Sequence, residues 1–220
     1  MIELLHTVPL FSRLNMNQLE SISGICTKKS FKTGTVLFHE KELGSVFYIV
    51  HSGSVKIYTA GSTGEEKILS LMKPRDSFGE LSLIDGKPRS ATARTLEDNV
   101  LISISGQDFI TLLKTHFDIS LGIMQELSTR LRESNQHVHD LTFLDARSRV
   151  IRSLITLANK NGIRTGSTIT IKMTLNYDEV SQMAGVQKPI LIQVIRELQE
   201  KQIITMPGHE MKLDLAKLRA

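Results

Sequence analysis

Residues 78–93 read FGELSLIDGKPRSATA and lie within a series of short apolar segments that glycine residues separate. Segments of this length and spacing are typical of strands in an antiparallel sandwich or barrel. We expect strands at 36–38, 46–50, 55–58, 67–71, 91–95 and 100–104. Turn signals stand between them at Gly34, Gly44, Gly53, Gly61 to Gly64, Gly79 and Asp85-Gly86. The chain between about residues 31 and 104 is therefore predicted to be a β domain.

Helical patterns flank this β domain. In front of it, Asn17 is expected to cap a short helix that ends near residue 25. Behind it, apolar residues recur every three or four positions from 107 to about 142 without a proline, which predicts one long helix. A second helix is expected over 146–161, where Asn161-Gly162 is a good stop signal.

A seven-residue repeat runs along the long helix. Met124, Leu131 and Val138 are seven positions apart, with further apolar or small residues between them. An apolar seam of this period predicts a parallel dimer. Because the seam is short, packing of the helix against the chain's own sheet remains the alternative.

The last part of the chain has the pattern of a helix-turn-helix followed by a hairpin. Helical segments at 176–184 and 189–201 are separated by the turn GVQK at 185–188. An edge strand is expected at 168–173. Strands at 203–206 and 210–213, joined by Pro207-Gly208, are expected to form a small hairpin, the wing.

Composition excludes several classes of protein. With 40% hydrophobic and 23% charged residues among 220, the chain is neither disordered nor collagen-like. Cys26 is the one cysteine, which excludes an internal disulfide, a structural zinc site with several thiolates and an iron–sulfur cluster. No apolar run approaches the roughly 20 residues of a membrane span, and we see no export signal. We expect a cytoplasmic protein with no metal and no membrane contact.

Charge is distributed unevenly along the chain. Residues 1–140 hold 15 basic and 16 acidic side chains, a net charge of −1, whereas residues 141–220 hold 12 and 7, a net charge of +5. A basic C-terminal part suggests an anionic partner, with nucleic acid the leading candidate. A basic solvated face without any partner is the alternative.

Two motifs resemble a known family. The segments FGELSL (78–83), IDGKP (84–88) and RSATA (89–93) resemble the phosphate-binding cassette of cyclic-nucleotide-binding domains, and FLDARSRV (143–150) resembles the hinge of CRP/FNR transcription regulators. The resemblance implies an α+β chain in three parts. These are an antiparallel, jelly-roll-like β-roll over 1–117, a long dimerisation helix and hinge over 118–145, and a winged helix-turn-helix DNA-binding domain over 146–220.

The cassette has the chemistry that a cyclic phosphate and a ribose hydroxyl require. Glu80 can accept a hydrogen bond from the hydroxyl, and Arg89 can form a charge-assisted pair with the phosphate. Gly79 allows close approach of the backbone, while Ser90 and the Ala91 amide can complete the cradle. By resemblance, the ligand-contacting residues are Gly79, Glu80, Leu81, Arg89, Ser90 and Ala91. The alternative is a hairpin in which Glu80 and Arg89 form only a salt bridge.

The base of the nucleotide is expected to meet the long helix. The family offers a Thr-Ser pair there, one residue from each subunit, and Ser134 and Asn135 occupy those places in this chain. Cyclic AMP is the preferred effector, while cyclic GMP, a cyclic dinucleotide or loss of nucleotide response remain open. A polar pair in a dimer seam that fixes only the register is the alternative role.

The resemblance also implies a recognition helix in the second part. Its expected DNA-binding residues are Gln187, Lys188, Pro189, Ile190, Gln193 and Arg196. Relatives commonly carry an Arg-Glu pair followed four residues later by Arg, where this chain has Lys188-Pro189 and Gln193. Since Gln prefers adenine and Lys takes guanine or phosphate, the half-site should differ from the usual one. A weakly binding domain is the alternative.

These features together predict a homodimeric transcription regulator. Effector binding to the β-roll is expected to reposition the two helix-turn-helix domains on a palindromic site in double-stranded DNA, with RNA polymerase as a further partner. Two alternatives keep the fold: a sensor of a non-nucleotide effector, and a regulatory module that binds a protein. No nucleophile elbow, P-loop or zinc-hydrolase motif occurs, so we expect no enzyme activity and no catalytic residues.

Overall fold

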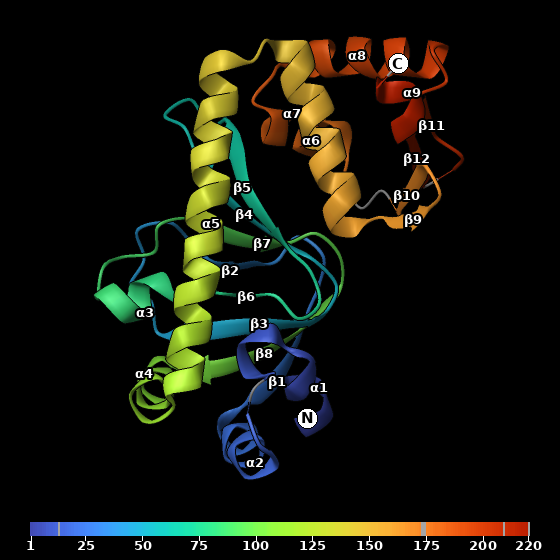
Figure 1. Ribbon diagram of the computed structural model, residues 1–220. Coiled ribbons are helices and arrows are strands. Elements are labelled where there is room, and N and C mark those ends of the chain that lie inside the picture. The colour runs from blue at the N-terminus through green and yellow to red at the C-terminus, as the bar shows by residue number, and fades with distance from the viewer. Residues whose placement is uncertain (13, 173–174, 209, 220) are drawn as a thin grey trace. The chain divides into compact units, whose positions relative to one another are not determined.

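The computed structural model in Figure 1 describes residues 1–12, 14–172, 175–208 and 210–219. The chain divides into two compact units, Met1–Ser134 and Asn135–Ala220. The first holds the β-roll and the second holds the helix-turn-helix. The α+β class predicted from the sequence is confirmed, with antiparallel sheets, a long helix and C-terminal helices. None of the helices within the described ranges is long and apolar enough to cross a membrane.

Three short helical segments open the first unit: α1 (Ile2–Thr7), the 3-10 turn η1 (Pro9–Phe11) and α2 (Met16–Ile25). The expected cap at Asn17 is wrong, because α2 begins after Asn15. The Asn15 side chain accepts from the Gln18 amide at 3.0 Å, and the Gln18 side chain accepts from the Asn15 amide at 2.9 Å. Leu14 and Leu19, which flank this reciprocal cap, are buried in one core. Their contact with the core sets where the helix starts.

Two antiparallel four-stranded sheets form the β-roll, ordered β1-β8-β3-β6 and β2-β7-β4-β5. All six strands expected from the sequence are present, and two further strands join them. The strands are β1 (Thr27–Phe31), β2 (Val36–Phe38), β3 (Val46–Ser52), β4 (Val55–Ala60), β5 (Glu66–Met72), β6 (Ser77–Phe78), β7 (Thr92–Thr95) and β8 (Asn99–Ser105). The two additions lack a clear apolar pattern: β1 reads TKKSF and is mostly exposed, and β6 has two residues.

Strands β3 and β8 are buried on both faces. Phe47 and Ile104 pack with the helices into one core, while Val50 and Leu101 pack into a second core with side chains of the other sheet. The alternation of side chains along a strand explains how one strand serves two cores. These central strands support the segment between β6 and β7, which carries the cassette.

The single helix expected over 107–142 is divided in two. Helix α4 (Gly106–Thr115) ends at His116, whose backbone is extended, and α5 (Phe117–Phe143) follows. A ring nitrogen of His116 lies 3.3 Å from the Gln18 side-chain nitrogen, and Ile119 in the next turn is fully buried. Because this break depends on contacts with a distant part of the chain, helical periodicity alone did not predict it.

The second unit begins within α5 and continues through α6 (Ala146–Asn161), α7 (Tyr177–Ala184), α8 (Lys188–Glu200) and α9 (Leu215–Arg219). Its sheet has the order β11-β12-β10-β9, made by β9 (Ile163–Thr165), β10 (Thr168–Lys172), β11 (Ile204–Thr205) and β12 (Glu210–Asp214). The expected edge strand, β10, is instead an inner strand between β12 and β9, and Met173 lies outside the described residues. The predicted wing is present as the β11–β12 hairpin.

Candidate functional site

The cassette is a sharp bend between β6 and the short helix α3 (Leu81–Asp85). Gly79 at this bend has a φ of +88°, a backbone conformation that residues with a Cβ rarely adopt. A Cβ there would lie 2.9 Å from Arg89 Nη1 and 3.1 Å from the Val46 carbonyl oxygen. Glycine is therefore required both by the backbone and by the close approach of Arg89.

Arg89 is buried beneath this bend. Its Nη1 donates to the Gly79 carbonyl at 2.6 Å and to Ser82 Oγ at 2.9 Å, and its Nη2 donates to the Val46 carbonyl at 2.7 Å. The guanidinium also lies over the ring of Phe38, 4.1 Å from its centroid. Nε is buried without a hydrogen-bond partner among the described residues. These contacts hold the guanidinium in one position and leave its Nε–H unused.

The charge on Arg89 is only partly compensated. Burial lowers the pKa of the guanidinium, and the nearby Tyr48, Glu80 and Glu42 act in the opposite direction. A guanidinium remains protonated in proteins despite such a shift. The site therefore presents a buried positive charge, for which an anion would be a favourable neighbour.

Glu80 is joined to helix α5, not to Arg89. Its Oε1 accepts from Arg130 Nη1 at 3.0 Å, so the alternative of a simple Glu80–Arg89 salt bridge is wrong in the part of the chain described. Arg130 also donates to Glu126 and to the Ser77 carbonyl. Glu80 Oε2 is buried and has no partner among the described residues. One carboxylate oxygen is thus bonded to Arg130, and the other is unused.

The cassette residues fit a cyclic nucleotide. An unused carboxylate oxygen accepts hydrogen bonds, as a ribose hydroxyl requires, and an unused guanidinium N–H donates, as a phosphate requires. Of the other expected ligand residues, Ala91 is buried, whereas Leu81 and Ser90 are exposed at the two ends of the cassette. Ser134 and Asn135 are exposed on α5, and Ser134 follows Arg130 by one helical turn. Their contacts to a base stay predictions.

The helix-turn-helix is stabilised by the caps of α7 and by hydrogen bonds from one arginine side chain. Helix α7 begins with a reciprocal cap between Asn176 and Glu179 and ends at Gly185, which has a φ of +63°. Arg149 on α6 donates to the carbonyls of Ala184 and Gly185 at 3.3 and 3.1 Å. The turn before α8 is therefore held by a guanidinium of another helix.

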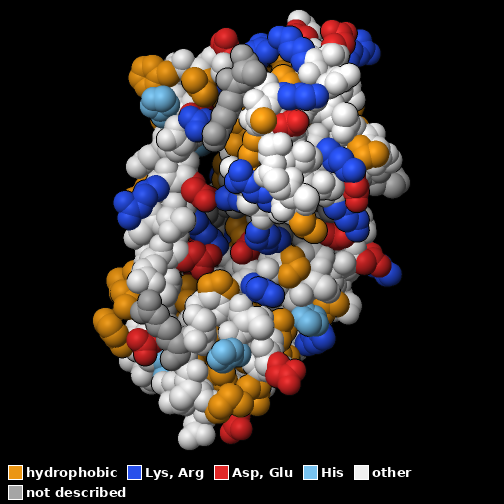
Figure 2. Space-filling model, turned by 45° about the vertical axis from the view of Figure 1, so that its right-hand side comes forward, with side chains coloured by type: hydrophobic (Ala, Val, Ile, Leu, Met, Phe, Trp, Pro, Cys, Tyr) orange, Lys and Arg blue, Asp and Glu red, His pale blue; other side chains and the backbone are white. Residues whose placement is uncertain are grey.

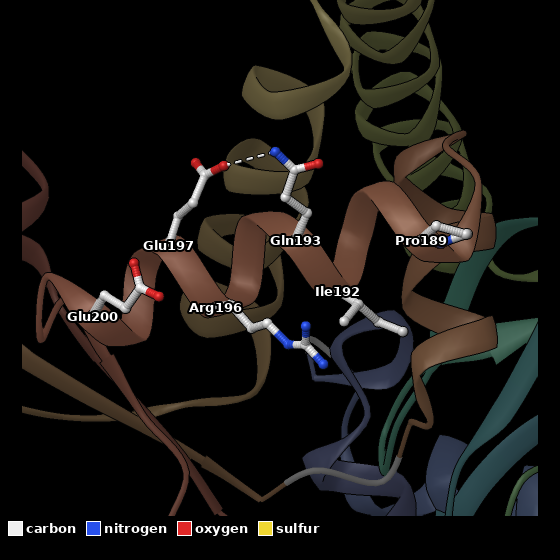
Figure 3. Close-up of a pocket in the computed structure, with 6 residues that line it drawn as sticks. All are labelled: Pro189, Ile192, Gln193, Arg196, Glu197 and Glu200. Atoms are coloured by element: carbon white, nitrogen blue, oxygen red, sulfur yellow. Dashed lines mark hydrogen bonds between the residues drawn. The ribbon is translucent and has the colours of Figure 1, made fainter.

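Helix α8 presents an open groove along its solvent-exposed face (Figure 3). The groove has a volume of about 470 Å³ and is lined by Pro189, Ile192, Gln193, Arg196, Glu197 and Glu200. Three of these were expected to bind DNA, whereas Ile192, Glu197 and Glu200 were not. Ile190, which was expected, lies on a half-buried side of the helix.

Two of the remaining expected residues stand at the start of α8. Gln187 is the N-cap residue, and Lys188 forms an exposed ion pair with Asp178 of α7, with 2.8 Å between Nζ and Oδ2. Exposed ion pairs of this kind contribute little to stability and exchange readily. Lys188 therefore remains accessible to a competing anion.

The chain is similar to several known proteins. Residues 28–116 match the model of the cyclic nucleotide-binding domain family. A CRP-like cAMP-activated global transcriptional regulator of Mycobacterium tuberculosis is 28% identical over 206 residues, which cover 94% of this chain and 92% of that protein. The structure of a CRP/FNR family transcriptional regulator from Thermus thermophilus is 25% identical, with a TM-score of 0.69, covering 88% of this chain and 96% of that one. The chain is therefore similar over most of its length to transcription regulators of the CRP/FNR family.

A solved structure with a similar fold is that of a c-di-GMP responsive global regulator from Xanthomonas campestris. Its TM-score is 0.75 at 22% identity, and the match covers 91% of this chain and 99% of that one. At this identity the likeness concerns the fold alone. The two names differ in their effector, so similarity to these regulators leaves the effector of this chain to be argued from its own residues.

Two residues of the candidate site, Glu126 and Arg130, were not predicted from the sequence. Glu126 and Arg130 form an i, i+4 pair on α5, a pattern that is visible in the sequence but is usually a surface feature. Burial raises the pKa of Glu126, with Arg130 opposing the shift. Nothing in the sequence around residue 130 indicated the contact with Glu80, which lies in another element.

On the face shown in Figure 2, Lys and Arg side chains are interspersed with Asp and Glu side chains. On α8 itself, Lys188 and Arg196 are balanced by Glu197 and Glu200. Any recognition by this helix therefore depends on individual side chains more than on a general positive potential.

Proposed function

We propose that this protein is a transcription regulator that binds a cyclic nucleotide in the β-roll and double-stranded DNA through α7 and α8. The observation that carries the proposal is the pair of buried, unused polar atoms in the cassette, Glu80 Oε2 and Arg89 Nε. Buried polar groups are rarely left without partners unless a ligand or water supplies them. The proposal covers three parts: the sensory roll at 1–117, the helix and hinge at 118–145, and the DNA-binding domain at 146–220.

Cyclic AMP is the effector we propose first. Arg89 and Ser90 would hold the phosphate together with the amides of Leu81 and Ala91, and Glu80 would accept from the ribose hydroxyl. Support comes from the cyclic-nucleotide-binding match and from the name of the Mycobacterium tuberculosis relative. Cyclic GMP and a cyclic dinucleotide are the competing effectors, because Ser134 and Asn135 offer a different pair of groups to the base. No metal is part of the proposed site.

Coupling to DNA binding would pass through α5. Arg130 joins this helix to Glu80, so a ligand that donates a hydrogen bond to Glu80 would act on the same carboxylate that Arg130 binds. Met124, Leu131 and Val138 are 51%, 63% and 59% exposed, and we propose that they pack against a second copy of the chain. The ligand can act only by binding more tightly to one arrangement of this dimer than to the other.

In the dimer, two copies of α8 would enter successive major grooves, roughly 34 Å apart, on a palindromic operator. The proposed contact residues are Gln187, Lys188, Pro189, Ile190, Gln193 and Arg196. RNA polymerase would be a further partner at promoters, and the setting would be the cytoplasm. The protein would act by binding, without catalysis.

Isothermal titration calorimetry tests the effector. Cyclic AMP and cyclic GMP are titrated into the wild-type chain and into Arg89→Ala, Arg89→Lys and Glu80→Gln variants. We expect binding by the wild type, no binding by Arg89→Ala and weakened binding by the other two. Because Arg89 also holds the Gly79 carbonyl, thermal unfolding of each variant checks that the roll is intact. Equal binding by wild type and a folded Arg89→Ala variant would show that the cassette assignment is wrong.

A second candidate is a regulatory module that binds a protein through α8. The balance of two basic and two acidic side chains on that helix favours it. Binding to random duplex DNA at several salt concentrations separates the candidates. Phosphate contacts release counterions, so a DNA-binding protein loses affinity steeply as salt rises. Absence of duplex binding with and without nucleotide would favour the protein-binding module.

A further inference from the structure

Arg130 of α5 is shared by two carboxylates. Its Nη1 donates to Glu80 Oε1 at 3.0 Å, and its Nη2 donates to Glu126 Oε1 and to the Ser77 carbonyl. Glu126 lies one turn earlier on the same helix, and its Oε2 accepts from Ser77 Oγ at 3.3 Å. An Nη nitrogen carries two N–H groups, so Glu126 and the Ser77 carbonyl match the capacity of Nη2.

This sharing explains why one oxygen of Glu80 has no partner. An arginine that faces a carboxylate frequently forms two parallel hydrogen bonds, one to each oxygen. Here Nη1 of Arg130 reaches only Oε1 of Glu80, whereas Oε2 is buried without a partner among the described residues. In a two-bond pair of this kind Nη2 would reach Oε2, but Nη2 faces Glu126 and the Ser77 carbonyl instead.

We infer that Glu126 is a positioning residue that keeps Glu80 Oε2 available for the ribose hydroxyl of a cyclic nucleotide. This inference rests on the proposed binding of a nucleotide by the cassette. Without the Glu126 carboxylate, Nη2 of Arg130 retains only the Ser77 carbonyl, and the guanidinium can turn to bind both oxygens of Glu80. Oε2 would then face Arg130 and be partly satisfied before the ligand arrives. Glu126 therefore acts on the ligand through Arg130 and Glu80, without touching it.

The charges around Arg130 support this role. One guanidinium serves two carboxylates, so the three side chains carry a net charge of 1 − 2 = −1 when both acids are ionised. Burial raises the pKa of Glu126, Arg130 lowers it and Glu80 raises it, because the two carboxylates are close enough to repel each other. Removal of Glu126 would leave Glu80 as the single carboxylate paired with Arg130, and this strengthens the pair that competes with the ligand.

A pair of ligands and a pair of variants isolate this role. Cyclic AMP and 2′-deoxy cyclic AMP differ only in the hydroxyl that Glu80 would accept from, so the ratio of their affinities reports on this contact alone. Glu133→Ala is the matched control, because it removes the same charge from an exposed position of α5, seven residues or roughly 10 Å further along the helix. Glu126→Gln keeps the shape, and its amide oxygen can still accept from Arg130 Nη2.

The experiment is calorimetric titration of both ligands into the full-length wild type, Glu126→Ala, Glu126→Gln and Glu133→Ala, with cyclic GMP and its 2′-deoxy form as a second pair of probes. A hydrogen bond to a charged acceptor is worth about tenfold or more in affinity, so the wild type should prefer the ribose form by about this factor. Glu126→Ala should lower the preference at least about threefold, which corresponds to half of that hydrogen-bond energy. Glu126→Gln should lower it less, and Glu133→Ala should keep it.

The outcomes separate the role of Glu126 from the binding of a nucleotide. If a folded Glu126→Ala variant keeps the ribose preference of Glu133→Ala, the role of Glu126 is overturned and nucleotide binding stands. An equal loss of affinity for the ribose and deoxyribose forms would indicate a structural role and would also overturn the inference. If thermal unfolding shows that Glu126→Ala does not fold, the ratio for Glu126→Gln decides in the same way. If the wild type binds none of the four probes, the proposed effector is wrong and the inference with it.

Discussion

Gly79→Ala is the change that the cassette geometry predicts most sharply. The new Cβ would lie 2.9 Å from Arg89 Nη1 and 3.1 Å from the Val46 carbonyl oxygen, on a backbone with a φ of +88°. Arg89 would have to move, at the expense of its 2.6 Å hydrogen bond to the Gly79 carbonyl. The left-handed backbone costs about 1 kcal/mol, and a lost bond from a charged donor costs about 2 kcal/mol. We expect a loss of about 3 kcal/mol in the free energy of unfolding.

Gly86→Ala is the matched control. Gly86 ends α3 with a φ of +68°, and a Cβ there would meet nothing within 4 Å. The control carries the backbone cost of about 1 kcal/mol without the steric conflict. Urea unfolding of the full chain, followed by tyrosine fluorescence to which Tyr48 and Tyr58 of the β-roll contribute, measures both variants, and calorimetry measures cyclic AMP binding. Gly79→Ala should lose binding and Gly86→Ala should keep it. Equal losses of stability in the two variants would refute the claim that Arg89 requires glycine at position 79.

Three further predictions concern other parts of the fold. Lys32, with the backbone and side chain of Thr33, lowers the pKa of Asp98 from 3.8 to about 2, so its contribution to stability is present above pH 4 and disappears as the pH falls to about 2. Asp98→Asn should therefore be less stable than wild type at pH 5 and equal to it near pH 2 in urea titrations. Burial raises the pKa of the Cys26 thiol from 9.0 to about 11, so the folded chain at pH 8 should react with iodoacetamide at least about tenfold more slowly than the urea-unfolded chain. Leu131→Asp places a charge in the exposed row on α5 and should convert the proposed dimer to a monomer in sedimentation velocity.

Each of these predictions has a control or an outcome that would contradict it. Thr129→Asp adds the same charge to an exposed position of α5 outside the seven-residue repeat, and it should leave the dimer intact. If both α5 variants behave alike, the exposed row is not the dimer contact. A pH profile of Asp98→Asn that stays parallel to the wild type would exclude the Lys32 pair as the cause, and equal thiol reactivity in folded and unfolded chains would exclude burial of Cys26.

Local patterns predicted much of the fold. Most of the six expected strands combine a short apolar run with a nearby glycine turn, and the turn that begins at Gly185 separates the two helices of the helix-turn-helix as expected. These features depend on residues close together in the chain. The start of α2 was misplaced although the reciprocal cap of Asn15 and Gln18 is a local pattern. The division of the long helix could not be predicted locally, because the Gln18 contact at His116 joins distant parts of the chain.

In the candidate site, too, local sequence predicted some features, and contacts between distant residues could not be predicted. The cassette was recognisable because FGELSL and RSATA are continuous segments of sequence, and Gly79 could be singled out as a position of close approach. The partner of Glu80 could not be predicted, because Arg130 lies 50 residues away on another helix. Arg130 and Glu126 looked like an ordinary surface pair until the fold placed Glu80 beside them.

The sequence by itself determined the order of the elements, the identity of the cassette and the presence of two parts with different charge, since these depend on short segments and on composition. Only the tertiary structure decided which polar atoms are paired and which are left over. Arg89 donates to two backbone carbonyls, and Glu80 accepts from Arg130 on α5. Arg89 Nε and Glu80 Oε2 are left without a partner among the described residues. Hydrogen bonds are short and directional, so their partners are set by the positions of distant segments in space, which no local pattern contains.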